Sequence, residues 1–172
     1  MSGQMGRFGA SWSALTWVVT LLVIGVAIVA VGVLLSRAEE AQGIGRVALL
    51  GVAMVVPVAL GFAVVFAPLG YTVDDVGIVV NRIGPKVCIL QGEIADIGRL
   101  SARDLGFSVR VCGSGGFFGF FGRFWSRRLG HHRMYATNMR DLVFVERMDG
   151  TRFILSPYPA DVFVAAIEEA RR

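Results

Sequence analysis

The hydrophobic positions of this chain form two long uninterrupted runs near the N-terminus, followed by short runs with polar breaks. The first long run, residues 14–35, has no charged side chain and lies between Arg7 and Arg37. At 1.5 Å per residue it is roughly 33 Å long, about the thickness of a bilayer's hydrocarbon core, and it predicts a transmembrane helix. Trp12 and Trp17 lie at its start, where aromatic rings prefer the headgroup level. A cleavable signal peptide would have a shorter apolar core and a small-residue cleavage site, so we favour a retained helix.

The second long run, residues 47–69, is also uncharged and predicts a second transmembrane helix. Since residues 36–46 are the only connection, the two helices must be antiparallel, and both chain termini lie on one side of the membrane. Neither run contains an ionisable side chain, the usual mark of an ion pathway, so we expect an anchor rather than a transporter. Small residues would let the backbones approach closely or are ordinary apolar filler, namely Gly25, Ala27, Ala30, Gly32, Gly51, Ala59, Gly61 and Ala63.

Beyond residue 70 the hydrophobic pattern changes to the period of β-strands. Turn residues separate seven short β-rich runs, and the clearest turns are Gly84-Pro85 and Asp149-Gly150. The seven expected strands are residues 71–73, 77–83, 86–91, 107–112, 131–137, 141–147 and 151–156. Residues 159–172 then predict an amphipathic helix that covers an open end of the sheet with its Phe163 and Ile167 stripe.

Residues 113–130 break the strand pattern and are the most distinctive stretch of the chain. Glycines there separate five Phe, one Trp and three Arg. Such a loop suits insertion at a membrane surface, because aromatic rings enter the acyl boundary and guanidinium groups bind phosphates. The lipid-binding candidates are Phe117, Phe118, Phe120, Phe121, Arg123, Phe124, Trp125, Arg127 and Arg128. The alternative is that the rings fold back into the core and the glycines only permit tight turns.

Composition agrees with a chain that lies partly in lipid, because charged residues make up only 17% of it, against about 25% in soluble domains. Only five charged side chains fall in residues 1–70, so we expect a transmembrane hairpin there and a separate domain over residues 71–172. The net charge of +4 is too small for a dedicated nucleic-acid binder. High apolar content and two cysteines exclude disorder and a disulfide-stapled fold.

The positive charges beside the two helices suggest an orientation. Arg37 and Arg46 lie in the short connection, whereas Arg7, Arg82 and Lys86 lie on the other side of the helices. By the positive-inside rule this small excess favours an inner-membrane protein whose C-terminal domain is cytoplasmic.

Cysteine and histidine supply the residue types of a zinc site but not its spacing. His131 and His132 are adjacent and would point to opposite faces of a strand, and we expect either to be a surface or loop residue. Cys88 and Cys112 are expected to be reduced thiols that fill small spaces in the core. No nucleophile motif accompanies the histidines, so the sequence predicts no enzyme, no metal and no cofactor.

The order of these segments resembles the bacterial PH-like (pleckstrin-homology-like) domain family of small membrane proteins with two N-terminal transmembrane helices. The resemblance rests on Tyr71-Thr72-Val73-Asp74-Asp75-Val76-Gly77-Ile78, the glycine- and Phe-rich stretch 113–122, Leu129-Gly130, Tyr135-Ala136-Thr137 and Ile154-Leu155-Ser156-Pro157. It implies a PH-like seven-stranded antiparallel β-barrel capped by a C-terminal α-helix, and no catalytic activity. The expected fold class is therefore an α+β membrane protein in which a two-helix hairpin precedes this barrel.

The resemblance does not bring a phosphoinositide site with it, because Asp74-Asp75-Val76-Gly77 stands where lipid-binding PH domains carry several cations. Arg82 and Lys86 at the next turn are either headgroup contacts or a solvated tip. We expect a membrane-anchored binding or scaffold module for a protein partner or the anionic membrane surface, with peptide addition to a sheet edge as one mode. The alternative is an accessory subunit of a larger membrane complex, with the hairpin as its interface.

Overall fold

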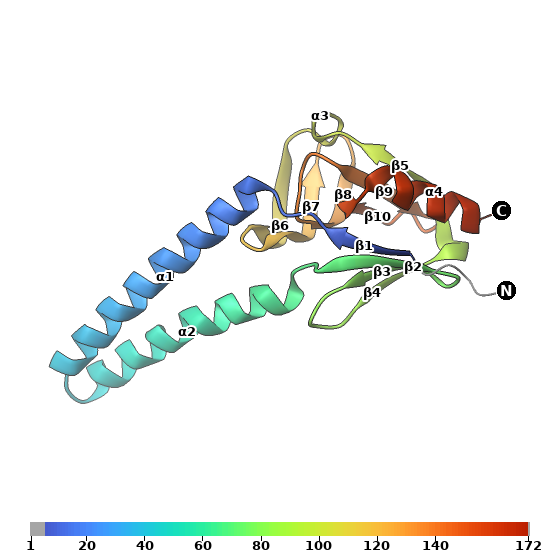
Figure 1. Cartoon of the computed structure of the whole chain (residues 1–172). Coiled ribbons are helices and arrows are strands. Elements are labelled where there is room, and N and C mark those ends of the chain that lie inside the picture. The colour runs from blue at the N-terminus through green and yellow to red at the C-terminus, as the bar shows by residue number, and fades with distance from the viewer. Residues whose placement is uncertain (1–5, 172) are drawn as a thin grey trace.

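The computed structural model describes residues 6–171, which form a long helical arm and a β-rich domain (Figure 1). The arm consists of two antiparallel helices, α1 (Ala14–Glu40) and α2 (Ile44–Phe66), so both predicted helices are present. The buried and half-buried positions of α2 follow heptad spacing, as in a coiled coil: Leu49, Ala53, Val56, Leu60 and Ala63. They face Ala27, Ala30, Val31, Leu34 and Ala38 of α1, which show the same pattern.

The glycines of the arm do not bring the two helices together, so for these residues the reading as apolar filler holds. A Cβ atom added at Gly25, Gly32, Gly51 or Gly61 would meet no other atom within 4 Å. Alanines occupy the helix contact instead, because a methyl group still fills the gap between the backbones.

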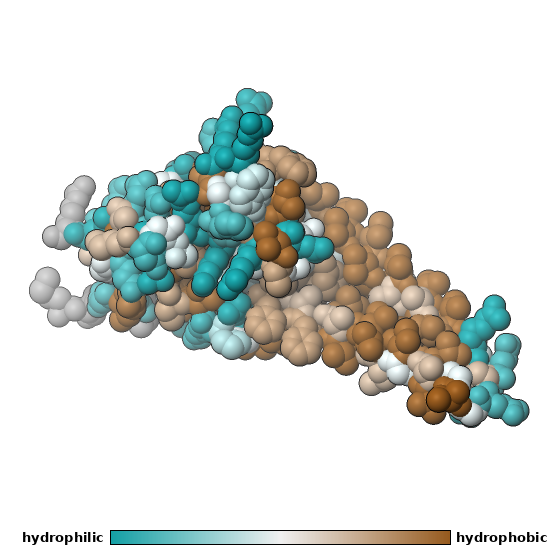
Figure 2. Space-filling model, turned by 180° about the vertical axis from the view of Figure 1, so that it is seen from behind, coloured by the Kyte–Doolittle hydropathy of each residue, from teal (hydrophilic) through white to brown (hydrophobic). Residues whose placement is uncertain are grey.

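Both helices are long and apolar enough to cross a membrane. Figure 2 shows hydrophobic residues over the arm, between the hydrophilic residues of the domain and a second hydrophilic group at the far tip. The tip is the connection between the helices, which is flanked by Arg37 and Arg46. This arrangement of apolar and polar surface is typical of a membrane-spanning hairpin.

The expectation of one seven-stranded antiparallel barrel is wrong in strand count, closure and direction. Within residues 6–171 there are eleven strands in two sheets, and the barrel is not closed. The first sheet has the order β11 (Pro157–Tyr158), β1 (Gly6–Ala10), β2 (Gly70–Asp74), β3 (Gly77–Asn81) and β4 (Val87–Leu90). The second has the order β5 (Ile94–Leu100), β9 (Leu142–Arg147), β10 (Arg152–Leu155), β8 (Gly130–Ala136), β7 (Gly119–Ser126) and β6 (Ser108–Gly116). Its neighbours β8 and β10 run parallel.

The strand β1 comes from the segment before the first helix, which the sequence pattern grouped with the hairpin. It pairs with β2 and β11, and its Phe8 is buried with its ring centroid 5.0 Å from that of Phe163. The strand has only five residues, and three of them are Gly or Ala. The alternation of polar and apolar side chains therefore gave no strand signal. The chain therefore enters the domain before it enters the arm.

Residues 113–130 are not a loop, which is a further correction. They complete β6 and β7, turn at Phe117-Phe118 and continue into β8. Gly113 pairs with Gly122 at positive φ of +125° and +121°, and an added Cβ would lie only 2.0 Å and 2.2 Å from the opposing backbone carbonyl oxygens. The glycines thus allow two backbones to approach, whereas a glycine-rich pattern usually indicates a loop.

The C-terminal helix α4 (Ala160–Ala170) is present as predicted, with Phe163 and Ile167 fully buried in the main hydrophobic core. Both sheets contribute to this core, for example through Ile78 of β3 and Val145 of β9. Short helical turns, η1 (Gln91–Glu93) and α3 (Ala102–Leu105), precede and follow β5. Asp149-Gly150 joins β9 to β10 as predicted, with φ of +77° at Gly150.

A buried hydrogen-bond network links the two sheets. The Tyr71 hydroxyl on β2 donates to the Tyr135 carbonyl at 2.6 Å and accepts from the Ser156 amide at 3.1 Å. The Ser156 hydroxyl oxygen accepts from the Thr137 amide at 2.8 Å. Burial raises the pKa of Tyr71 to about 12, so the neutral phenol is the form that the folded protein holds.

The same network continues into the start of α1. The Thr137 carbonyl accepts hydrogen bonds from the Ser13 amide at 3.2 Å and the Thr16 hydroxyl at 2.8 Å. One turn later, the Thr20 hydroxyl oxygen accepts from the amide of Phe118 at 3.1 Å. The first two turns of α1 are therefore fixed to the domain.

The end of α2 is fixed as well. The Gly84 amide in the β3–β4 turn donates to the Val65 carbonyl at 2.8 Å, and the Leu69 amide donates to the Asn81 carbonyl at 2.8 Å. These bonds satisfy backbone groups where the helix stops, as helix ends require. Arm and domain are joined at both helices.

We expect Gly122→Ala to lower the free energy of unfolding by about 2 kcal/mol or more, because the new Cβ would meet the Cys112 carbonyl at a positive φ. Gly98→Ala in β5 is the matched control, since its Cβ meets nothing within 4 Å, and it should change stability by less than about 1 kcal/mol. Thermal unfolding of the detergent-solubilised protein, followed by circular dichroism, measures both. Equal effects of the two substitutions would contradict the pairing of Gly113 with Gly122.

We expect the protein to lose stability as pH rises from 10 towards 12. Tyr71 has its usual pKa near 10 when unfolded and about 12 when folded, so its contribution is complete below pH 10 and disappears as pH passes 12. Tyr71→Phe should cost about 1–3 kcal/mol at neutral pH, because the Ser156 amide and Tyr135 carbonyl lose their partner, and should flatten the alkaline decline. Unfolding midpoints across this pH range test both effects, and an unchanged alkaline slope in Tyr71→Phe would contradict them.

Candidate ligand-binding cavity

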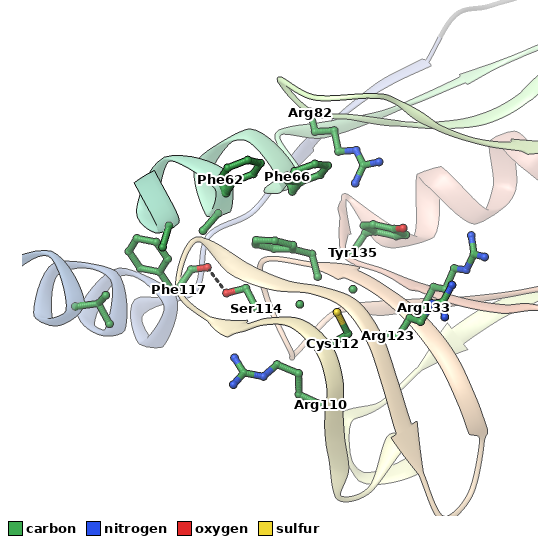
Figure 3. Close-up of a pocket in the computed structure, with 16 residues that line it drawn as sticks. Phe62, Phe66, Arg82, Arg110, Cys112, Ser114, Phe117, Arg123, Arg133 and Tyr135 are labelled. Atoms are coloured by element: carbon green, nitrogen blue, oxygen red, sulfur yellow. Dashed lines mark hydrogen bonds between the residues drawn. The ribbon is translucent and has the colours of Figure 1, made fainter. Parts of the chain in front are cut away.

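A cavity of about 720 Å³ lies between the domain-side ends of the two helices and the sheet formed by β6, β7 and β8 (Figure 3). Its helix side is apolar, with Val23 from α1, Ala59, Phe62 and Phe66 from α2, and Phe117 from the β6–β7 turn. Its other walls carry four arginines, Arg82, Arg110, Arg123 and Arg133, and no acidic residue. The cavity is therefore amphipathic, with one apolar wall and a cationic wall opposite.

Strand register brings two of these arginines together. Arg123 of β7 and Arg133 of β8 are direct cross-strand partners, and Cys112 of β6 is the partner of Arg123 on the other side. A β-bulge between Arg110 and Cys112 shifts the register at the point where Arg110 enters the cavity wall. The Arg110 side chain runs forward along its own strand towards the β6–β7 turn, away from Arg123 and Arg133, with its Cδ 3.6 Å from where a Cβ of Gly115 would lie (Figure 3).

Arg82 reaches the cavity from the β3–β4 turn (Figure 3). Its guanidinium lies over the rings of Phe66 and Tyr135, at 5.3 Å and 5.6 Å from their centroids, and donates to the carbonyl of Pro85. These contacts hold the cation in place without neutralising it. Lys86, the other predicted cation of this turn, is exposed and does not line the cavity.

Within residues 6–171, none of the four cavity arginines forms an ion pair with a carboxylate. The domain's ion pairs instead use Arg99, Arg128, Arg147 and Arg152. Like charges directly opposite each other on neighbouring strands destabilise a sheet, and Arg123 and Arg133 form such a pair. An anion bound between them would relieve that repulsion, so the site has the electrostatics of an anion-binding site.

The structure brings only part of the predicted lipid-binding set to this cavity. Phe117, Phe121 and Arg123 line it, and Phe118 contacts Trp12 beside α1 with ring centroids 5.5 Å apart. Phe121 is also buried in the main core, while Phe124 is buried and Phe120 half-buried in a second core cluster. Trp125, Arg127 and Arg128 are exposed towards the other end of β7, where Arg128 donates to the Arg103 carbonyl of α3. In Figure 1, α3 lies at the top of the domain, apart from the β6–β7 turn that contacts α1.

The cysteines are exposed, which corrects the expectation that they fill the core. Cys112 lines the cavity, and Cys88 lies on β4 outside it. Among residues 6–171, no group of three His, Cys, Asp or Glu side chains is placed to hold a metal ion.

The two histidines point to opposite faces of β8, as predicted: His131 is exposed and His132 is buried. The expectation that both are surface residues is therefore wrong for His132. Its ring nitrogens lie 3.2 Å from the Ser108 hydroxyl and 3.0 Å from the Gly130 carbonyl. Burial lowers the pKa of His132, so it is a neutral structural residue at physiological pH.

Sequence reasoning missed Arg110 and Arg133. Arg133 lies two residues from Tyr135, another cavity residue, which is the spacing of one strand face, whereas the bulge between Arg110 and Cys112 breaks that spacing on β6. This spacing can be used only once β7 is recognised as a strand between β6 and β8. The glycines of β7 made that segment look like a loop in the sequence.

Residues 69–171 match a family model described as Bacterial PH domain. The chain belongs to the bacterial PH domain family. Comparisons with curated proteins and with solved structures gave no match. PH domains are generally non-catalytic binding modules, and the matched residues extend from just before β2 to the end of α4. The PH domain thus supplies the cationic wall of the cavity, and the arm supplies the apolar wall.

We expect Arg123→Gln to raise the free energy of unfolding by about 0.5 kcal/mol in uncharged detergent, because it removes the repulsion from Arg133 across the strand pair. Arg127→Gln at the exposed β7–β8 turn is the control, and it should leave stability within about 0.5 kcal/mol of the unchanged protein. Raising the salt concentration should reduce the gain from Arg123→Gln by screening. A clear loss of stability in Arg123→Gln would show that this arginine is structurally paired.

Proposed function

We propose that this protein is a membrane-anchored, non-enzymatic binding module, in which α1 and α2 cross the bilayer and hold the PH domain against one membrane surface. The apolar surface of the arm, bounded by polar residues at both ends, supports this arrangement (Figure 2). The binding face is the side of the β6–β7–β8 sheet that looks towards the arm.

The observation that carries this proposal is the attachment of the β6–β7 turn to α1. The Phe118 amide donates a hydrogen bond to the Thr20 hydroxyl oxygen, and the Phe118 ring packs on the Trp12 ring. The ring centroids of Trp12 and Trp17 lie 4.9 Å apart. Aromatic rings of this kind favour the membrane–water interface. A domain fixed in this way cannot move off the membrane surface, so its cationic face is held at headgroup level.

The ligand that this face suits best is anionic, since its arginines have no carboxylate partner among residues 6–171. We propose that this ligand is the anionic membrane surface. The alternative ligand is a protein partner. On the charge asymmetry of the sequence we also propose an inner-membrane location with the PH domain in the cytoplasm, where surface lipids are anionic.

A second candidate function is that of a subunit in a larger membrane complex. Gly25 and Gly32 lie on exposed surface of α1, one heptad apart, with open space around each. Such positions would allow another transmembrane helix to approach closely.

The membrane position of the domain is tested by tryptophan quenching in bilayers that contain brominated lipids. Two single-tryptophan variants of the full chain are needed, one that keeps Trp17 on α1 and one that keeps Trp125 on β7. Trp17 is 53% exposed on the arm and should be strongly quenched, whereas Trp125, near the far end of β7, should be quenched little. Similar quenching of both, or of neither, would overturn the proposed arrangement.

A further inference from the structure

We propose that the cavity between the arm and the PH domain is a site for a single anionic phospholipid. Its phosphate would bind among Arg82, Arg123 and Arg133, and its acyl chains would leave the cavity along Val23, Ala59 and Phe62. The inference rests on the proposed function only in requiring that α1 and α2 cross the bilayer.

The charge distribution favours a phosphate as the group bound. Guanidinium groups form paired hydrogen bonds to phosphate oxygens, and Arg123 and Arg133 come from neighbouring strands while Arg82 approaches from the β3–β4 turn. Arg123 and Arg133 are exposed, so their donors are free to meet a ligand. A zwitterionic lipid would bring its own cation to this cluster, which disfavours it.

The apolar wall favours a lipid over a free anion or an acidic peptide. Val23, Ala59 and Phe62 belong to the parts of the helices that are apolar enough to lie in the bilayer, and Phe62 is 62% exposed. The opposite walls belong to the PH domain (Figure 3). A ligand that satisfies both walls must have a charged head and a hydrocarbon tail, and a membrane supplies such molecules at the right depth.

The size and rigidity of the cavity agree with one bound headgroup. Its volume of about 720 Å³ falls within the range of small-molecule sites, roughly 300–1,000 Å³. Its walls are held by the Phe118–Thr20 and Gly84–Val65 hydrogen bonds, so the arginines are positioned before the lipid arrives. Pre-organisation of this kind reduces the entropy lost on binding.

The two native cysteines provide a test in the intact protein. Cys112 lines the cavity and Cys88 lies outside it, so one molecule carries both a reporter and an internal control. The full chain is placed in nanodiscs of phosphatidylcholine, with or without phosphatidylglycerol, and the rate of reaction with an uncharged maleimide is measured at each cysteine. With the lipid at about ten times its Kd, the rate at Cys112 should fall about tenfold while that at Cys88 stays constant.

Two further arms identify the chemical source of the protection. Oleate in phosphatidylcholine supplies an anionic amphiphile without phosphate, and inorganic phosphate added to phosphatidylcholine nanodiscs supplies phosphate without acyl chains. Neither should protect Cys112 as phosphatidylglycerol does. Equal protection by inorganic phosphate would overturn the lipid assignment, and equal protection by oleate would overturn the phosphate assignment.

Paired variants separate a specific site from general attraction to a charged surface. Arg123→Gln/Arg133→Gln should abolish the protection of Cys112, whereas Arg103→Gln/Arg127→Gln removes the same charge near α3 and should preserve it. Circular dichroism confirms that both variants are folded. Protection that survives in the first variant, disappears equally in both, or is absent from the unchanged protein would overturn the proposal. Trp17 quenching would be unaffected by that failure, so the proposed membrane arrangement is judged separately.

Discussion

Thr137 makes the connection on which the relation between arm and domain depends. Its amide bonds to Ser156, its carbonyl accepts two hydrogen bonds from the start of α1, and its hydroxyl donates to the Ser11 carbonyl at 2.8 Å. These groups are largely buried, so a tilt of α1 would leave several polar atoms without partners at a cost of about 1–3 kcal/mol each. The helix axis is therefore set by the PH domain and not by the flexibility of a linker.

The cavity is a consequence of this rigid connection. The β6–β7 turn rests on α1, and the β3–β4 turn rests on the end of α2. Phe118 even adopts a positive φ of +54°, a conformation that bulky residues rarely adopt, to place its amide on Thr20. Two turns that are far apart in the sequence thereby become opposite sides of one site.

The arginines of the domain fall into two groups that differ in their ion pairing. Arg147 pairs with Glu93 and Asp149, and Arg99 pairs with Asp141 and Asp161. In the part of the chain that the structure describes, the cavity arginines have no such partners, although carboxylates at neighbouring positions would have stabilised the sheet. A local loss of stability that is confined to one pre-organised cavity is a common feature of binding sites.

Local sequence determined the elements whose signals are periodic and short in range. The apolar runs fixed α1 and α2, the Phe163 and Ile167 spacing fixed α4, and the residues that carried the family resemblance include Tyr71, Thr137 and Ser156, which the fold joins in one network. Tertiary structure alone decided that residues 119–126 are a strand, because the glycine pattern is read correctly only when the opposing backbone is known. It also decided the parallel pairing of β8 with β10 and the pairing of Arg123 with Arg133, since cross-strand register depends on contacts between residues far apart in the chain.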